Sequence, residues 1–216
     1  MRLLDVIRLF PKRTGRLKKH VAGFRYQIFP FWLLELIFQL IEIVGVSDFY
    51  DTSSNIVKFN TRRLTEREII LAKTIFGTSL PYGRVRVDER AHIGPRQGQF
   101  CYVSFYTINS WGRMSDPLLI HELMHVWQYH QVGIVYIPRA LSAQRSPEGY
   151  DYGGADALYK AISEEKHLLD FNYEQQAEII EDYFRLLVGL KTTWGKATSA
   201  DLPVYAHFAK QLNNLA

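Results

Sequence analysis

The chain has 216 residues, of which 47% are hydrophobic and 14% aromatic, which suits one packed globular domain and excludes a disordered chain. Its single cysteine, Cys101, excludes an intramolecular disulfide and a cysteine-based zinc site. The net charge of +4 is unevenly placed, because residues 2–25 hold eight Lys or Arg and only one acidic residue. Taking these from the totals of 26 and 22 leaves 18 basic and 21 acidic residues elsewhere.

The N-terminal region combines a basic arm, residues 1–25, with an apolar segment, residues 31–46. Glu35, Gln39 and Glu42 interrupt this segment at spacings of four and three, which predicts one polar stripe on an otherwise apolar helix. The uninterrupted apolar runs are too short to span a bilayer. No small-residue cleavage site follows a clean apolar run, so we expect no classical signal peptide.

These features divide the chain into two parts. We expect residues 1–50 to form an appendage for docking or packing, and residues 51–216 to form the functional domain. Contact of residues 1–46 with a membrane surface stays open, and no nucleic-acid partner is expected.

The middle of the chain predicts one helix and three strands. Residues 47–64 read as loop-rich, with a short strand at Ile56–Phe59. Thr65 and Glu68 form a capping box that opens a helix ending near Gly77. Strands are predicted around Val85 and Val87, and over Phe100–Ile108. Together with the helices that follow, this pattern predicts an α+β fold that is mostly helical with a small antiparallel sheet.

The motif His-Glu-Leu-Met-His at residues 121–125 carries the functional signal. Ser115 or Asp116 can cap a helix around it, and no Gly or Pro interrupts the run from Leu118 to Val132. Positions i and i+4 share a helix face, so His121 and His125 can reach one metal ion, with Glu122 beside it as a general base.

A catalytic zinc site usually takes a third protein ligand. Asn172 can cap a later helix in which Glu174, Glu178 and Asp182 recur at four-residue intervals. One of these carboxylates could bind zinc, and another could accept a hydrogen bond from the remote N–H of a ligand imidazole.

The sequence HELMH, followed some fifty residues later by E-x-x-A-E, resembles the gluzincin metallopeptidases. That resemblance implies Glu174 as the third ligand, with Glu178 in the place of an outer Asp. In the alternative register, E-x-x-x-D, Glu178 is the ligand and Asp182 lies behind it.

A broader resemblance covers residues 61–185. LTEREIILAKTIFG, YGRVRV, HELMHVWQ and DFNYEQQAEIIEDYF are together similar to zinc-peptidase toxin domains associated with bacterial type VI secretion. The resemblance implies a zincin-like fold and one zinc ion per chain. It also implies an antibacterial effector that hydrolyses peptide bonds with a zinc-bound water and Glu122 as general base.

The same resemblance implies a cellular setting. The substrate would be a protein or peptide, and the partners a component of the secretion spike and a cognate immunity protein. The chain would be made in the cytoplasm and secreted, and it would act in the periplasm of the target cell.

Four side chains are candidates, by chemistry alone, to stabilise the oxyanion of the reaction. They are Tyr150, Tyr152, Tyr205 and His207. The predicted strand at Phe100–Ile108 could align an extended substrate by edge hydrogen bonding. Two alternatives stay open: a peptidoglycan amide hydrolase, and a catalytically inactive zincin-like adaptor that docks to secretion components through residues 1–50.

Overall fold

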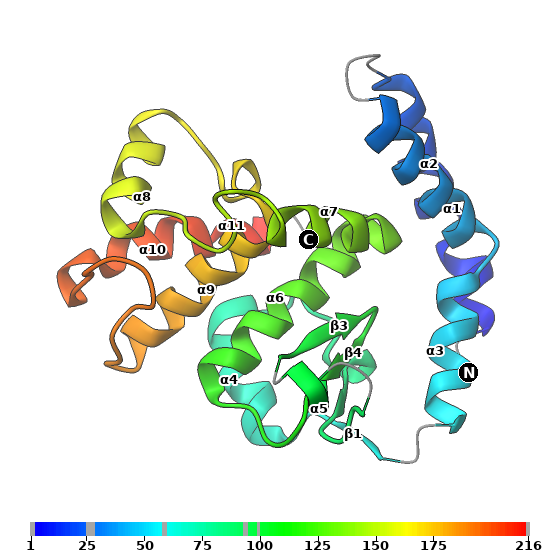
Figure 1. The fold of residues 1–216 in the computed structure, drawn as a ribbon, viewed down its shortest axis with the longest axis horizontal. Helices are drawn as coiled ribbons and strands as arrows, with labels where there is room; N and C mark the ends of the chain where they lie inside the picture. Colours follow the sequence, from blue (N-terminus) through cyan, green and yellow to red (C-terminus); the bar gives the residue numbers. More distant parts are fainter. Residues whose placement is uncertain (1–2, 25–28, 58–59, 93–94, 99, 215–216) are drawn as a thin grey trace.

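Helices and one small sheet make up the computed structural model, shown in Figure 1. It describes residues 3–24, 29–57, 60–92, 95–98 and 100–214. Most of the described chain is helical and the sheet has four strands, so the predicted α+β class is confirmed.

The bounds of the elements are as follows. The helices are α1 (Leu3–Ala22), α2 (Phe29–Ile43), α3 (Val46–Val57), α4 (Glu66–Phe76), α5 (Pro95–Gly98), α6 (Asp116–Val132), α7 (Tyr136–Gln144), α8 (Gly154–Ser163), α9 (Tyr173–Leu187), α10 (Leu202–Ala209) and α11 (Gln211–Asn214). The strands are β1 (Thr61–Arg63), β2 (Arg86–Asp88), β3 (Tyr102–Ser104) and β4 (Thr107–Asn109). Short 3-10 helices include η3 (Gly133–Val135) and η4 (Leu168–Asp170).

The sheet is mixed, whereas the sequence predicted an antiparallel one. Its strand order is β1-β2-β4-β3, in which β2 and β4 run parallel and the other two pairs run antiparallel. Phe100–Ile108 is not one strand, because Phe105 adopts a left-handed φ of 58° and reverses the chain between β3 and β4. Strand β4 then lies beside β2, where the fully buried Val87 and Ile108 are paired.

The segment before the sheet is also different from the prediction. Helix α3 covers Val46–Val57, where a loop and the start of a strand were expected. Residues 58–59, the rest of that predicted strand, lie outside the described residues. Asp48 explains part of the difference, because it stands in the first turn of α3 and pairs with Arg13 of α1 at 2.6 Å. This long-range ion pair cannot be read from local sequence.

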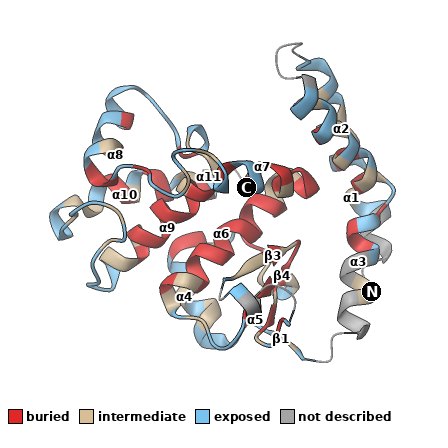
Figure 2. Ribbon diagram, viewed as in Figure 1, coloured by how far each residue is buried: buried red, intermediate tan, exposed pale blue. Residues whose placement is uncertain are grey.

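Other local predictions are confirmed. Thr65 and Glu68 form the capping box of α4, with each side chain bonded to the other residue's backbone N–H. Gly77 ends that helix with a φ of 51°. Helix α6 contains the whole His-Glu-x-x-His motif and contacts both the sheet strands β3 and β4 and helix α9 (Figure 1). The buried core, red in Figure 2, is centred on α6 and α9.

Helices α1 and α2, which we call the N-terminal hairpin, dock through charged groups. The polar stripe of α2 faces inward, and Glu42 accepts a hydrogen bond from Arg16 at 2.8 Å while lying 3.8 Å from Arg13 Nε. Glu35 binds the guanidinium of Arg139 on α7 through both carboxylate oxygens. Among the described residues, no helix has the length and apolar character that crossing a membrane requires.

The buried ion pairs of Glu42 and Asp48 with Arg13 and Arg16, which we call the Glu42 cluster, should contribute substantially to the free energy of unfolding. The side chain of Glu42 is almost fully buried, and Glu42→Ala would leave the half-buried Arg16 guanidinium without its counter-charge and remove one of the two acids beside the buried Arg13. Breaking a buried ion pair in this way costs about 3 kcal/mol or more. We therefore expect urea denaturation to show a loss of about 3 kcal/mol in the free energy of unfolding.

The control for this variant is Glu164→Ala, which removes the exposed ion pair with Lys166. That change should leave the unfolding midpoint near the wild-type value, since solvent screens exposed pairs. Equal midpoints for both variants and wild type would contradict a structural role for the Glu42 cluster.

Candidate metal centre

Helix α6 places two imidazoles on one face, one turn apart. Ser115 caps the helix by accepting a hydrogen bond from the Leu118 N–H, and Pro117 occupies the first turn. His121 and His125 are buried, and their ring centroids lie 4.9 Å apart. The packing of α9 across this face brings a carboxylate to both rings.

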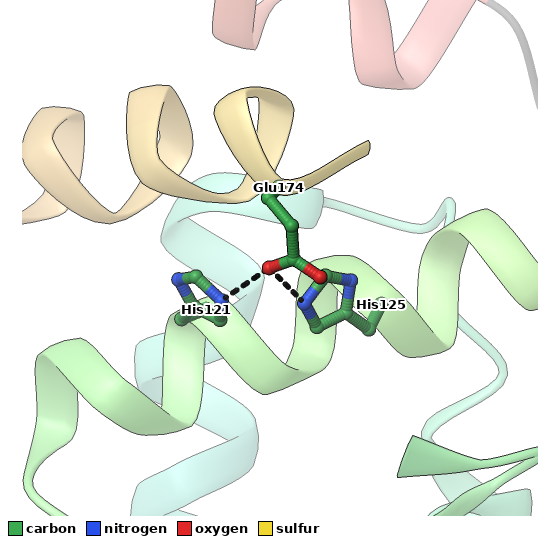
Figure 3. A group of neighbouring side chains, drawn as sticks. All are labelled: His121, His125 and Glu174. Atoms are coloured by element: carbon green, nitrogen blue, oxygen red, sulfur yellow. Dashed lines mark ion pairs between the residues drawn. The ribbon is translucent and has the colours of Figure 1, made fainter. Parts of the chain in front are cut away.

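Glu174 supplies that carboxylate from the first turn of α9. The Asn172 side chain accepts hydrogen bonds from the Glu174 and Gln175 N–H groups and so fixes where the helix begins. Glu174 Oε2 lies 3.5 Å from His121 Nε2 and 3.3 Å from His125 Nε2 (Figure 3). The other oxygen, Oε1, accepts a hydrogen bond from Gln144 Nε2 at 3.0 Å, which orients the carboxylate.

These distances fit a tetrahedral metal ion. Zinc bonds to imidazole nitrogen and carboxylate oxygen are about 2.0–2.2 Å long, so ligand atoms at a tetrahedral ion stand about 3.3–3.5 Å apart. The ligand atoms of His121, His125 and Glu174 all lie within 4.8 Å of one another. Glu174 Oε2 is buried and receives no well-directed hydrogen bond. The three residues therefore form a group that could hold a metal ion.

Hydrogen bonds behind His125 define its tautomer. Gln128 Nε2 donates to the carbonyl of Tyr173, which can only accept, and to Gln176 Oε1. The Gln128 Oε1 atom must therefore accept the proton of His125 Nδ1, 2.8 Å away. In a neutral ring, Nε2 then presents its lone pair to the Glu174 oxygen. Two electron-rich atoms at this distance repel each other unless a proton or a metal ion lies between them. Burial opposes a proton on either ring, but the neighbouring carboxylates outweigh burial and raise the pKa of both imidazoles, so the site favours a positive charge at this point.

His121 meets two more carboxylates on its other side. Its Nδ1 lies 3.4 Å from Glu178 Oε1 and 3.3 Å from Glu181 Oε2. Each carboxylate already has a donor, since Trp194 Nε1 bonds Glu178 at 2.9 Å and Arg185 Nε bonds Glu181 at 2.8 Å. His121, Glu178 and Glu181 also meet the distance limits of a metal group. Their existing donors favour a supporting role behind His121.

Helix geometry explains which acids face the site. At 100° per residue, position i+7 returns to within about 20° of position i, whereas i+8 lies about 80° away. Glu181 therefore lines up with Glu174, and Asp182 does not. The structure places Asp182 against the Tyr152 hydroxyl and the Thr193 and Trp194 N–H groups. The sequence analysis missed Glu181, although this angular rule could have identified it.

The pKa values of the acids diverge. Burial alone would raise the pKa of Glu174, but His125 and His121 hold it well below its usual value. Burial, with help from Glu181, raises the pKa of Glu178 to about 7 despite the lowering effect of His121. Burial also raises the pKa of Glu122, partly opposed by the two imidazoles. Glu174 is therefore the carboxylate of this group that most firmly holds a negative charge.

A cavity of about 480 Å³ opens on these groups. Its lining comprises Phe100, Cys101, Tyr102, Val103, His121, Glu122, His125, Tyr136, Ile137, Ala140, Leu141, Gln144, Tyr150 and Glu174. Glu122 is buried, and its Oε2 atom has no hydrogen-bond partner. Cys101 stays a neutral thiol, because burial and Glu122 raise its pKa to about 12. Strand β3, at the edge of the sheet, contributes Tyr102 and Val103 to the wall.

Of the four oxyanion candidates, the structure brings only Tyr150 to the cavity. Its ring centroid lies 6.3 Å from that of His121, and burial and nearby carboxylates raise its pKa to about 12. Tyr152 and Tyr205 instead bond each other at 2.8 Å inside the core. His207 is on α10 beside a different pocket.

Tyr136 is a cavity residue that the sequence analysis missed. Its ring lies 5.6 Å from His125, and burial raises its pKa well above the usual value, so the hydroxyl keeps its proton. Nothing in the local sequence distinguishes it from the other tyrosines. Gly133, with a φ of 74°, ends α6 and lets the chain change direction through η3 into α7. Tyr136, the first residue of α7, is thereby brought to the cavity.

Comparison with known proteins finds one distant relation. The chain is 32% identical over 137 residues to the type VI secretion system spike protein VgrG2b of Pseudomonas aeruginosa. The alignment covers 57% of this chain and 13% of the relative, so the chain spans only a small part of that protein's length. No family model and no solved structure matches the chain. The expected relation to a secretion spike protein is thus confirmed as a distant, partial homology.

The metal group predicts an order of affinities. If His121, His125 and Glu174 are the ligands, protein purified without chelator should contain one zinc ion per chain by elemental analysis. Glu178→Ala removes a supporting contact and should weaken binding by about 10–100-fold. Glu174→Ala removes a ligand and should weaken it further, as measured by competition with a chromophoric chelator.

The control is Glu66→Ala, an exposed acid of α4, which should leave zinc content unchanged. If Glu178→Ala loses more affinity than Glu174→Ala, the ligand is one helical turn further along α9.

Proposed function

We propose that the chain is a zinc-dependent peptidase, with zinc held by His121, His125 and Glu174 and with Glu122 as general base. The observation that carries this proposal is the Glu122 carboxylate. It is buried in the same cavity as the metal group, and one of its oxygens is unpaired. A buried carboxylate oxygen without a hydrogen-bond partner lowers the stability of the fold, and such groups are typical of catalytic sites.

A zinc ion bound in this group would polarise the scissile carbonyl and lower the pKa of a water molecule to about 7. The Glu122 carboxylate accepts a proton from the attacking water and delivers it to the leaving amine. Burial raises the pKa of Glu122, which makes its carboxylate a stronger base toward the water and leaves it able to pass the proton on to the amine. Tyr136 and Tyr150 keep their protons, so either hydroxyl can donate to the oxyanion.

The supporting residues keep the ligands in place. Gln128 holds the Nδ1 proton of His125, and Glu178 and Glu181 face Nδ1 of His121. Such outer contacts fix the tautomer of a ligand imidazole and make it a stronger base. Asp182 accepts hydrogen bonds from the Tyr152 hydroxyl and from the backbone N–H groups of residues 193–194, and these bonds hold α9 in position.

The shape of the cavity favours a peptide as substrate. Strand β3 is the last strand of the sheet among the described residues, and Tyr102 and Val103 line the cavity wall. A strand at the edge of a sheet can bind an extended peptide through backbone hydrogen bonds. No charged side chain outside the metal group and Glu122 lines this cavity among the described residues, so we propose a preference for apolar or aromatic side chains near the scissile bond.

The relation to VgrG2b supports a role in type VI secretion. We propose an antibacterial effector that a spike component delivers to the target periplasm, and that a cognate immunity protein restrains in the producing cell. In this proposal residues 51–216 form the zincin-like enzyme and residues 1–50 an appendage. Two other functions are tested against this proposal: hydrolysis of amide bonds in peptidoglycan, and a role as a catalytically inactive adaptor.

The Glu122→Gln variant provides the test. It keeps the size and burial of the side chain but removes the base, so we expect wild-type zinc content and unfolding midpoint. Hydrolysis of a protein panel should fall by at least about 100-fold, the lower range for loss of a general base. Glu66→Gln on the exposed face of α4 is the matched control and should keep full activity.

Two results would contradict the proposal. Glu122→Gln protein that cleaves as fast as wild type would exclude Glu122 as the base. Wild-type protein that releases amines from purified peptidoglycan but cleaves no protein would move the function to cell-wall hydrolysis.

A further inference from the structure

Helix α2 has its polar stripe inside and its apolar stripe outside. Glu35, Gln39 and Glu42 are 5%, 6% and 3% exposed. The opposite face of the helix presents Leu33, Ile37 and Leu40, and Val44 follows directly after its end; these four are 38%, 45%, 48% and 77% exposed. Their spacing of four, three and four residues makes one continuous stripe. A water-facing helix normally shows the reverse arrangement.

Helix α1 repeats the pattern. Its inward face carries Arg13 and Arg16, which pair with the acids of α2 and α3. Ile7, Phe10 and Val21 point outward and are 76%, 48% and 50% exposed. At 100° per residue these three positions fall within about 60° of one another.

Exposed apolar side chains are concentrated in this part of the molecule. Of the 23 large hydrophobic residues that are exposed among the described ones, 12 lie between residues 7 and 49, about a fifth of the chain. In Figure 2, α2 is drawn mostly in the colours of exposed and intermediate residues. A concentration of this kind marks an interaction surface, because isolated exposed apolar residues are ordinary but grouped ones are not.

The N-terminal hairpin also exposes basic residues. Arg8, Lys18 and Lys19 are exposed on α1, and no acidic partner for them is found among the described residues. Two copies of the chain joined through this surface would bring their basic residues together, which is unfavourable. A hairpin that exposes both apolar side chains and cations fits an anionic lipid bilayer instead, because the headgroups attract each Lys or Arg.

We propose that the outer face of the N-terminal hairpin is a membrane-docking surface that binds anionic phospholipid. Leu33, Ile37, Leu40 and Val44 enter the boundary between headgroups and acyl chains, while the basic residues of α1 contact the headgroups. The hairpin lies along the bilayer surface and does not cross it, since α2 has only 15 residues. The ion pair of Glu35 with Arg139 and the hydrogen bond from Arg16 to the Gln131 carbonyl tie this surface to α7 and α6, and so to the proposed enzyme site.

Vesicle sedimentation with the 216-residue chain tests the proposal. Wild-type protein should bind vesicles of mixed phosphatidylglycerol and phosphatidylcholine, and should bind vesicles of phosphatidylcholine alone at least tenfold more weakly. The double variant Ile37→Ser/Leu40→Ser should reduce binding to the anionic vesicles at least tenfold. Lys18→Glu/Lys19→Glu should do the same, and high salt should weaken wild-type binding.

Ile70→Ser is the matched control, because Ile70 is 68% exposed on α4, away from the hairpin. It should bind vesicles as wild type does, and all variants should keep the wild-type circular dichroism spectrum and zinc content. The proposal is overturned if wild-type protein ignores anionic vesicles. It is also overturned if the protein is a dimer in solution that Ile37→Ser/Leu40→Ser converts to a monomer, since a second copy would then cover the surface.

Discussion

The contact between α6 and α9 brings two imidazoles and several carboxylates into one buried interface, and the site depends on how their charges are balanced. Glu122 on α6 and Glu174, Glu178 and Glu181 on α9 are all less than 10% exposed. Burying so many acids is unfavourable unless each has a donor or a cation nearby. Glu178 and Glu181 have Trp194 and Arg185, whereas one oxygen each of Glu122 and Glu174 has no donor.

The N-terminal part of the chain handles buried acids in a different way. Glu35, Glu42 and Asp48 are each matched by an arginine, from α7 or α1. Those acids serve to hold helices together, and arginine, which is always charged, suits that purpose. At the α6–α9 contact Arg185 is paired with Glu181, and Glu174 is left with two imidazoles whose charge depends on protonation. A group of this kind can exchange protons for a metal ion, which a guanidinium cannot do.

The extent to which sequence predicted this structure follows from the range of the interactions involved. The capping box at Thr65, the cap at Ser115 and the spacing of His121 and His125 are local, and each was predicted correctly. The parallel pairing of β2 with β4 depends on contacts distant in sequence, and so does the helix at Val46–Val57. Tyr136 in the cavity and the inward orientation of Glu35 are likewise long-range features, visible only after folding.

Crystals grown with zinc and measured on both sides of the zinc absorption edge test the central claim most directly. The account predicts one anomalous peak per chain, within bonding distance of His121 Nε2, His125 Nε2 and Glu174 Oε2. No peak in this cavity, or a peak held instead by His121 Nδ1, Glu178 and Glu181, would contradict it.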